Sequence, residues 1–85
     1  MKKVVIYSST VCPYCVKAKK LLETKGVDYK ELNIDENPDF IDESVKRSGG
    51  RTTVPQVFID DVHVGGCDEL YDLDRENKLD PLLES

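Results

Sequence analysis

The chain of 85 residues has no tryptophan, one histidine and only three cysteines. It also has no long hydrophobic stretch, since the apolar run near its start covers only Val4 to Ile6 before the polar Ser8. A membrane span needs about 18 apolar residues, and a secretory signal peptide needs an apolar region of at least about 7. We therefore expect a cytoplasmic protein that has no membrane partner.

Positive charge is also in short supply. Twelve Lys and Arg residues stand against seventeen Asp and Glu residues, which gives a formal net charge of -5. Such a surface repels the phosphate backbone that nucleic-acid-binding proteins neutralise, so we expect no nucleic-acid partner. The length is that of one small domain, and we expect residues 1–85 to form a single domain and a monomer.

Hydrophobic patterns and helix-end signals divide the chain into seven expected elements. Strands are expected at 3–7, 27–34, 54–59 and 62–64, and helices at 13–25, at 38–48 and from about Asp68 onward. A strand-helix-strand unit favours a parallel pair, and a hairpin adds antiparallel strands to the same sheet. The prediction is an α/β fold with a four-stranded mixed sheet flanked by three helices, and with Leu79, Leu82 and Leu83 closing the core.

Two of the cysteines, Cys12 and Cys15, are separated by only two residues at the expected start of a helix. Pro13 suits the first helical position, because its missing N–H would be unpaired there in any case. Cys12 is then the N-cap. Val11 is expected to join Ala18 on the apolar side of this helix.

This placement favours redox chemistry. Only a thiolate attacks a disulfide, and a free cysteine with a pKa near ~8.5 is mostly protonated at neutral pH. The unpaired N–H groups at a helix N-terminus stabilise an anion, which predicts that Cys12 is the nucleophile. Cys15 lies one turn further on, within disulfide reach but away from those N–H groups, which predicts that it is the resolving thiol.

An inert structural pair and a metal site are the alternatives for these cysteines. Zinc ribbons carry a second Cys-x-x-Cys about 15 to 20 residues further on. Here only His63 and Cys67 follow, roughly fifty residues later. This spacing favours redox chemistry over zinc binding, and we expect no bound metal.

Three motifs follow one another along the chain. Cys12–Cys15 (CPYC) opens a helix, Thr52–Gln56 (TTVPQ) enters a strand, and Gly65–Asp68 (GGCD) precedes the last helix. In this order and spacing they resemble the dithiol glutaredoxins over almost the whole chain. The resemblance implies a thioredoxin fold, with glutathione as co-substrate and no bound cofactor. It also implies reduction of protein disulfides and of glutathione mixed disulfides through Cys12 and Cys15.

The resemblance also implies where glutathione binds. Thr53 and Val54 pair their backbone with its cysteinyl part, and Pro55 supplies a cis bond that aims this backbone at the ligand. The γ-glutamyl carboxylate meets the N–H groups at the start of the last helix, while Asp68 pairs with the ammonium group. The implied glutathione contacts are Tyr14, Thr53, Val54, Pro55, Gly66, Cys67 and Asp68.

One position departs from the family pattern. Many glutaredoxins carry a lysine three residues before the nucleophilic cysteine, where this chain has Ser9. The expected thiolate therefore depends more on the helix terminus alone. Arg51, Lys46 and Arg47 are the candidates for meeting the glycyl carboxylate, and the sequence does not choose among them.

The other candidate residues have simpler interpretations. Cys67 is expected to be a small buried side chain, His63 to point to solvent, and the acidic residues from Asp68 onward to form a solvated helix face. The expected partners are glutathione and disulfide-containing or glutathionylated proteins, with ribonucleotide reductase as a family expectation. A thioredoxin-like electron donor reduced by a flavoprotein is the alternative function, followed by an iron-sulfur or zinc carrier.

Overall fold

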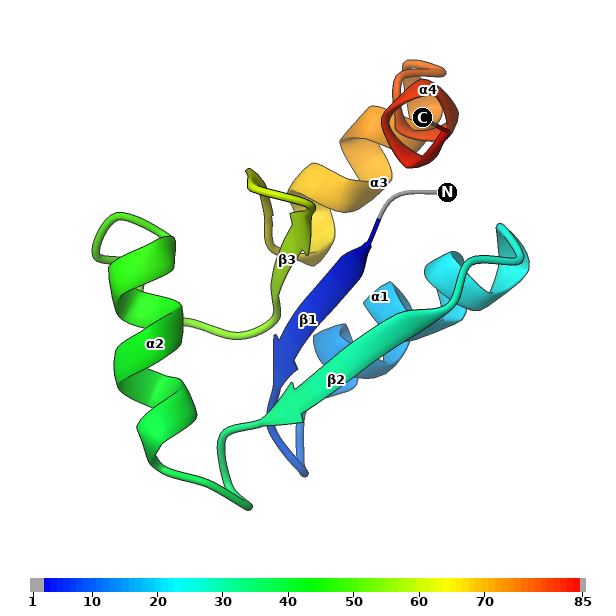
Figure 1. Ribbon diagram of the computed structural model, residues 1–85. Helices are drawn as coiled ribbons and strands as arrows, with labels where there is room; N and C mark the ends of the chain where they lie inside the picture. Colours follow the sequence, from blue (N-terminus) through cyan, green and yellow to red (C-terminus); the bar gives the residue numbers. More distant parts are fainter. Residues whose placement is uncertain (1–2, 85) are drawn as a thin grey trace.

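The computed structural model describes residues 3–84, which form a four-stranded sheet with helices on both faces (Figure 1). In chain order the elements are β1 (Val4–Ser8), α1 (Pro13–Thr24), β2 (Tyr29–Asn33), α2 (Asp39–Arg47), β3 (Gln56–Ile59), β4 (Val62–Gly65), α3 (Cys67–Arg75) and α4 (Leu79–Leu83). The strand order is β2-β1-β3-β4, with β1 parallel to β2 and both remaining pairs antiparallel. The predicted mixed sheet is therefore confirmed.

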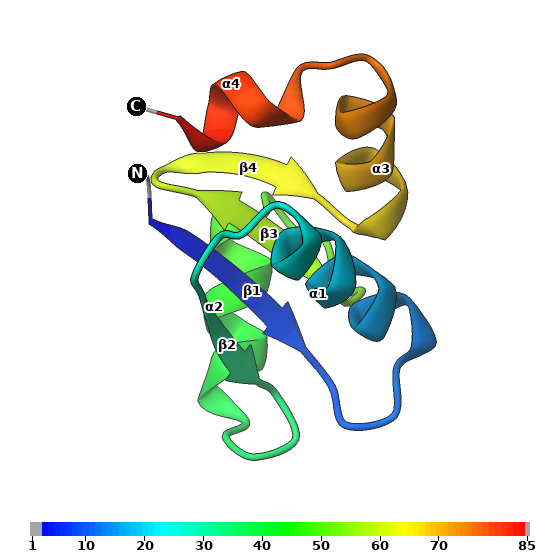
Figure 2. The same ribbon diagram turned by 90° about the vertical axis from the view of Figure 1, so that its right-hand side faces the viewer.

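The central strand β1 is buried along its whole length. Because side chains alternate along a strand, Val4 and Ile6 join the larger apolar core. Val5 and Tyr7 join a smaller core, against which Phe40 of α2 packs. Figure 2 shows α1 and α3 on one side of the sheet and α2 on the other. The unbroken apolar run at the start of the sequence thus serves both faces.

The C-terminal segment adds a fourth helix to the three predicted. Asn77 has a positive φ of 60°, the left-handed conformation in which helices commonly end, and it separates α3 from α4. Leu79 and Leu83 are four residues apart and both buried, so one face of α4 closes the core. Pro81 lies in the first turn, where no helical hydrogen bond needs its N–H.

Two strands are shorter than predicted. β2 covers only the middle of the expected 27–34, and β3 begins at Gln56 instead of Val54. Pro55 cannot donate a hydrogen bond to a neighbouring strand, so the ladder starts after it. Within residues 3–84, no helix has the length and apolar character needed to cross a bilayer.

Candidate active site

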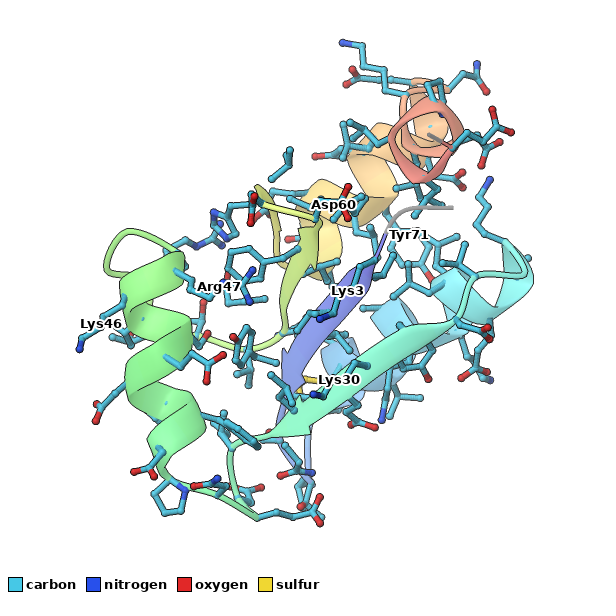
Figure 3. The ribbon with its side chains drawn as sticks, viewed as in Figure 1. Lys3, Lys30, Lys46, Arg47, Asp60 and Tyr71 are labelled. Carbon is cyan, nitrogen blue, oxygen red and sulfur yellow. A yellow bond between two sulfur atoms is a disulfide. The ribbon has the colours of Figure 1, made fainter. Side chains whose placement is uncertain are left out.

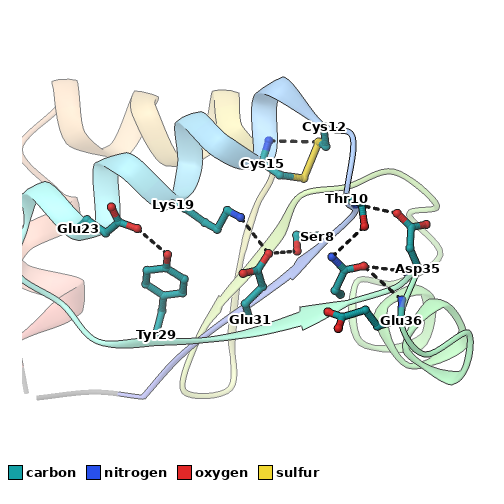
Figure 4. Close-up of polar contacts among 11 residues, drawn as sticks. Ser8, Thr10, Cys12, Cys15, Lys19, Glu23, Tyr29, Glu31, Asp35 and Glu36 are labelled. Atoms are coloured by element: carbon teal, nitrogen blue, oxygen red, sulfur yellow. Dashed lines mark hydrogen bonds and ion pairs between the residues drawn. A yellow bond between two sulfur atoms is a disulfide. The ribbon is translucent and has the colours of Figure 1, made fainter.

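The two spaced cysteines lie where α1 begins (Figure 4). Cys12 precedes the helix in an extended conformation, with φ of -150° and ψ of 98°, and Pro13 occupies the first turn. The sulfur of Cys12 accepts a hydrogen bond from the backbone N–H of Cys15 at 3.1 Å. Cys12 is therefore the N-cap, as predicted, and its sulfur lies at the positive end of the helix dipole.

Cys12 and Cys15 differ in exposure. Cys12 is half-buried, whereas Cys15 is only 1% exposed. Their sulfur atoms are joined as a disulfide, and their Cα atoms lie 5.2 Å apart. An incoming molecule can thus reach Cys12 but not Cys15. Cys15 lies within disulfide distance of Cys12 and can form a bond with it once Cys12 has reacted.

Residues at and just after the end of β2 hold the loop before Cys12. The backbone N–H of Thr10 donates to Asp35 Oδ2 at 2.7 Å, and the side chain of Asn33 donates to Thr10 Oγ1 at 3.4 Å (Figure 4). Val11 is 89% exposed, so the prediction that it packs with the helix is wrong. It precedes the N-cap and points away from the core, which leaves an exposed apolar side chain next to the half-buried Cys12.

A groove of about 150 Å³ lies next to Cys12. The sulfur of Cys12 is 4.0 Å from the carbonyl oxygen of Val54, one of the groove residues. All seven residues that the resemblance implied for glutathione line this groove, together with Arg51 and Glu69. The complete lining is Tyr14, Arg51, Thr53, Val54, Pro55, Gly66, Cys67, Asp68 and Glu69.

One wall of the groove is the segment 51–55. The peptide bond between Val54 and Pro55 is cis, as expected. Within residues 3–84, residues 51–54 make no backbone–backbone hydrogen bond. The carbonyl of Thr53 accepts a hydrogen bond from Gln56, so the N–H and carbonyl of Val54 are the backbone groups with bonding capacity beside the sulfur, which an extended ligand can use as an added strand would.

The opposite wall is the start of α3. The first three N–H groups of this helix, from Cys67 to Glu69, precede the first bond of its backbone ladder, which runs from Leu70 to Gly66. Gly65 has a φ of 117°, and a Cβ atom there would lie 2.6 Å from the carboxylate of Glu69. Only glycine therefore fits this turn, which brings the helix terminus up to the groove.

Glu69 is a groove residue that the sequence analysis assigned to a solvated face. Its Oε1 accepts the backbone N–H of Gly66 at 2.9 Å and pairs with Arg51 Nη1 at 2.8 Å. The hydrogen bond from Gly66, followed by that from Arg51, lowers the pKa of Glu69 below its ordinary 4.5. A glutamate three residues after an N-cap is the capping-box spacing, which was the available signal.

The structure separates the three basic candidates for the glycyl carboxylate. Arg51 lines the groove. Arg47 reaches from α2 to the sheet, where its guanidinium lies 4.1 Å from the Phe58 ring and donates to the Tyr7 hydroxyl at 3.0 Å. Lys46 projects away from the molecule (Figure 3). Arg51 is therefore the basic side chain placed to meet a ligand in the groove.

The structure confirms the prediction for Cys67 and contradicts the one for His63. Cys67 is 7% exposed, as predicted, and burial is the main cause that raises the pKa of its thiol. Its sulfur is poorly suited to attack, so its backbone is the part available to a ligand. His63 does not point to solvent as predicted, because the hairpin register places it opposite Phe58, on which its ring stacks with centroids 4.9 Å apart.

Comparison with known proteins identifies the family. The glutaredoxin family model matches residues 4–64. Glutaredoxin 3 of Escherichia coli strain K12 is 57% identical over 84 residues, which cover 99% of this chain and 100% of that protein. The chain belongs to the glutaredoxin family. The solution structure of glutaredoxin from Brucella melitensis has 50% identity and a TM-score of 0.85, and the match covers 99% of this chain and 90% of that one.

Membership of the glutaredoxin family establishes the fold and the activity of the chain. The fold is the thioredoxin fold, as the resemblance implied, here with α4 added. The protein is a glutathione-dependent thiol-disulfide oxidoreductase that uses glutathione as co-substrate. A buckwheat glutaredoxin-glutathione complex has a TM-score of 0.87 at 37% identity, over 96% of this chain and 76% of that one. Within residues 3–84, no three His, Cys, Asp or Glu side chains are grouped as metal ligands.

Proposed function

We propose that Cys12 is the attacking thiol of this enzyme and Cys15 the resolving thiol. The support is their position at the start of α1, where Cys12 is accessible and beside the helix N–H groups while Cys15 is buried. Thiolate character and access both govern the rate of disulfide exchange. The two cysteines therefore divide the work, with the first meeting the substrate and the second acting only on the bond that the first has formed.

With a glutathionylated protein, the thiolate of Cys12 attacks the sulfur of the glutathione moiety. The disulfide of the substrate breaks, the protein leaves as a thiolate that takes up a proton, and Cys12 carries glutathione. The thiolate of a second glutathione then attacks the glutathione sulfur of this mixed disulfide. Oxidised glutathione leaves and the thiolate of Cys12 is restored.

With a protein disulfide, Cys12 first forms a mixed disulfide with one sulfur of the substrate. The thiolate of Cys15 attacks the sulfur of Cys12, which releases the reduced substrate and leaves the Cys12–Cys15 disulfide described above. Two glutathione molecules then reduce this bond in two exchanges and depart as oxidised glutathione.

The groove beside Cys12 is the proposed glutathione site. The observation that carries the proposal is that seven residues from three distant motifs line one groove whose Val54 carbonyl lies 4.0 Å from the Cys12 sulfur. The cysteinyl part of glutathione pairs with the backbone of Thr53 and Val54, which places the glutathione sulfur next to Cys12. Pro55 and Gly66 shape the floor, and Tyr14, which is 58% exposed, covers the ligand.

The charges of the groove match those of glutathione. The γ-glutamyl carboxylate lies at the N–H groups of Cys67 and Asp68, and the carboxylate of Asp68 meets the ammonium group. Arg51 meets the glycyl carboxylate, and its ion pair with Glu69 holds the guanidinium at the groove before the ligand arrives.

The macromolecular substrates that we propose are disulfide-containing and glutathionylated proteins. Ribonucleotide reductase, which forms a disulfide in each cycle, belongs to this class. The half-buried Cys12, flanked by the exposed Val11, supports access for a protein thiol or disulfide. We further propose that residues 1–85 act as a single monomeric domain in the cytoplasm, which fits an accessible thiol that must remain reducible.

The Cys15→Ser variant tests this division of labour. Turnover of a mixed disulfide between glutathione and a small thiol should stay within about threefold of wild type, because Cys15 takes no part in that cycle. Reduction of a protein disulfide should fall by more than about a hundredfold, because no thiol then resolves the mixed disulfide within the protein. Both rates are measured at fixed glutathione with coupled reduction of oxidised glutathione.

A parallel assay without glutathione, supplied with a flavoprotein disulfide reductase, is the control for the alternative electron donor. We expect no turnover there. Equal loss of both activities in Cys15→Ser would contradict the roles assigned to the two cysteines, and turnover without glutathione would contradict glutathione as the reductant.

A further inference from the structure

The groove segment 51–54 is held by side chains. Within residues 3–84, this segment makes no backbone–backbone hydrogen bond. Ser48 Oγ donates to the carbonyl of Arg51, the first residue of the segment, at 3.1 Å. Gln56 Nε2 donates to the carbonyl of Thr53 at 3.0 Å and lies 3.3 Å from its hydroxyl. The contact with Gln56 is therefore the one that fixes the peptide group next to Val54.

The side chain of Gln56 has a defined orientation. It is fully buried at the first position of β3, and its Oε1 lies 2.7 Å from His63 Nε2. A carbonyl oxygen only accepts hydrogen bonds, so the amide nitrogen must face Thr53 and the amide oxygen must face the histidine. His63 therefore carries its proton on Nε2 and donates it to Gln56.

His63 is itself anchored in the sheet. Its ring stacks on Phe58 at 4.9 Å between centroids, and Phe58 is only 2% exposed. Burial, followed by the charge of Arg51, lowers the pKa of His63 below its ordinary 6.5, which keeps the ring neutral at pH 7. A neutral ring has a single N–H, and Gln56 Oε1 takes it. A continuous series of contacts, through His63 and Gln56, therefore links Phe58 in the core of the sheet to the carbonyl of Thr53.

We propose that Gln56, oriented by His63, is a positioning residue for glutathione, because it fixes the Thr53 carbonyl and thereby aims the Val54 peptide at the ligand. The proposal depends on the glutathione site given above. Gln56 touches neither the ligand nor the reacting sulfur, and it acts only through Thr53. Its loss should therefore weaken binding while leaving the chemistry at Cys12 unchanged.

The test is the Gln56→Met variant, which keeps the length of the side chain and removes its donors. One hydrogen bond of this kind corresponds to a change of about two- to tenfold in an equilibrium constant. We expect KM for a glutathionylated peptide to rise by about fivefold and kcat to stay within about twofold. The rate of alkylation of Cys12 in the reduced protein should not change.

The Tyr29→Phe variant is the control for a general loss of stability. It removes a hydroxyl that donates to Glu23 at 2.7 Å, and it lies on β2, which β1 separates from β3 and Gln56. It should lower Tm, as Gln56→Met does, and leave KM unchanged. An equal rise of KM in both variants, or no rise in Gln56→Met, would overturn the positioning role.

Two histidine variants test the orienting contact. His63→Phe keeps an aromatic ring on Phe58 and removes the donor, so KM should rise by a smaller factor of about two. His63→Gln restores a donor of similar reach and should bring KM back toward the wild-type value. A His63→Gln variant that behaves as His63→Phe would show that the donor is not what matters.

The Asp68→Asn variant separates this inference from the proposed function. It removes the charge that faces the ammonium group of glutathione, and its KM should rise if the groove is the glutathione site. A rise in Asp68→Asn without a rise in Gln56→Met would reject only the positioning role. An unchanged KM in both variants would reject the glutathione site itself.

Discussion

The two sides of the active site, the attacking Cys12 and the groove wall that faces it, are held in different ways. Cys12 is fixed by the helix that it caps, through the N–H of Cys15 and the backbone ladder of α1. The segment that faces it, residues 51–54, is fixed by side chains, chiefly the amide of Gln56. Secondary structure thus sets the reactivity of the sulfur, and side-chain hydrogen bonds set the shape of the binding surface. Substitutions on the two sides should therefore affect different kinetic constants.

The largest effect is expected at the start of α1. Cys12→Ser should reduce turnover of both substrate classes by more than about 10³-fold, because a serine hydroxyl at neutral pH supplies no comparable nucleophile. The groove does not depend on this sulfur, so the variant should still bind reduced glutathione. Chemical-shift changes of the Val54 and Asp68 amides on glutathione addition measure that binding, and loss of binding together with turnover would mean that the two sides are not separate.

A smaller effect is expected at Glu69, which joins the opposite wall to Arg51. The folded-state pKa of Glu69 is lowered below 4.5, so its stabilising contribution is fully present above that pH and is lost as the pH falls through the folded-state value. Because both side chains of the pair are 42% exposed, this contribution should be at most about 1 kcal/mol. Glu69→Gln should be less stable than wild type by that amount at pH 7.

Urea unfolding of both proteins between pH 7 and pH 3 measures this difference. The difference should shrink as the pH falls below 4.5, because the wild-type carboxylate then becomes protonated. The other titrating groups are common to both proteins and cancel. A difference that stays constant with pH would show that the charge of Glu69 contributes nothing.

Features governed by neighbours along the chain could be predicted from the sequence. The N-cap at Cys12 follows from Pro13 and the helix that comes after it, and the burial of Cys15 follows from its place one turn further on. The burial of β1 on both faces follows from its unbroken apolar run. In each case the physical cause lies within a few residues of the effect.

Features governed by tertiary placement were missed. Glu69 meets Arg51 only because α3 begins beside the segment 51–55. His63 was expected in solvent because its valine neighbours fit a buried face, but the hairpin register pairs it with Phe58 and leaves Val62 49% exposed. The pairing register decides which side of a strand is covered, and the alternation of residues alone does not set it.

The thiol pKa of Cys12 in the reduced enzyme tests the central claim most directly. It is measured from the pH dependence of alkylation, with the label assigned to Cys12 by mass spectrometry. Because Ser9 supplies no positive charge, a lowered value would report on the start of α1. We predict a pKa below about 7.5 for Cys12 and a higher one for Cys15. A value for Cys12 at the ~8.5 of a free cysteine would contradict the account.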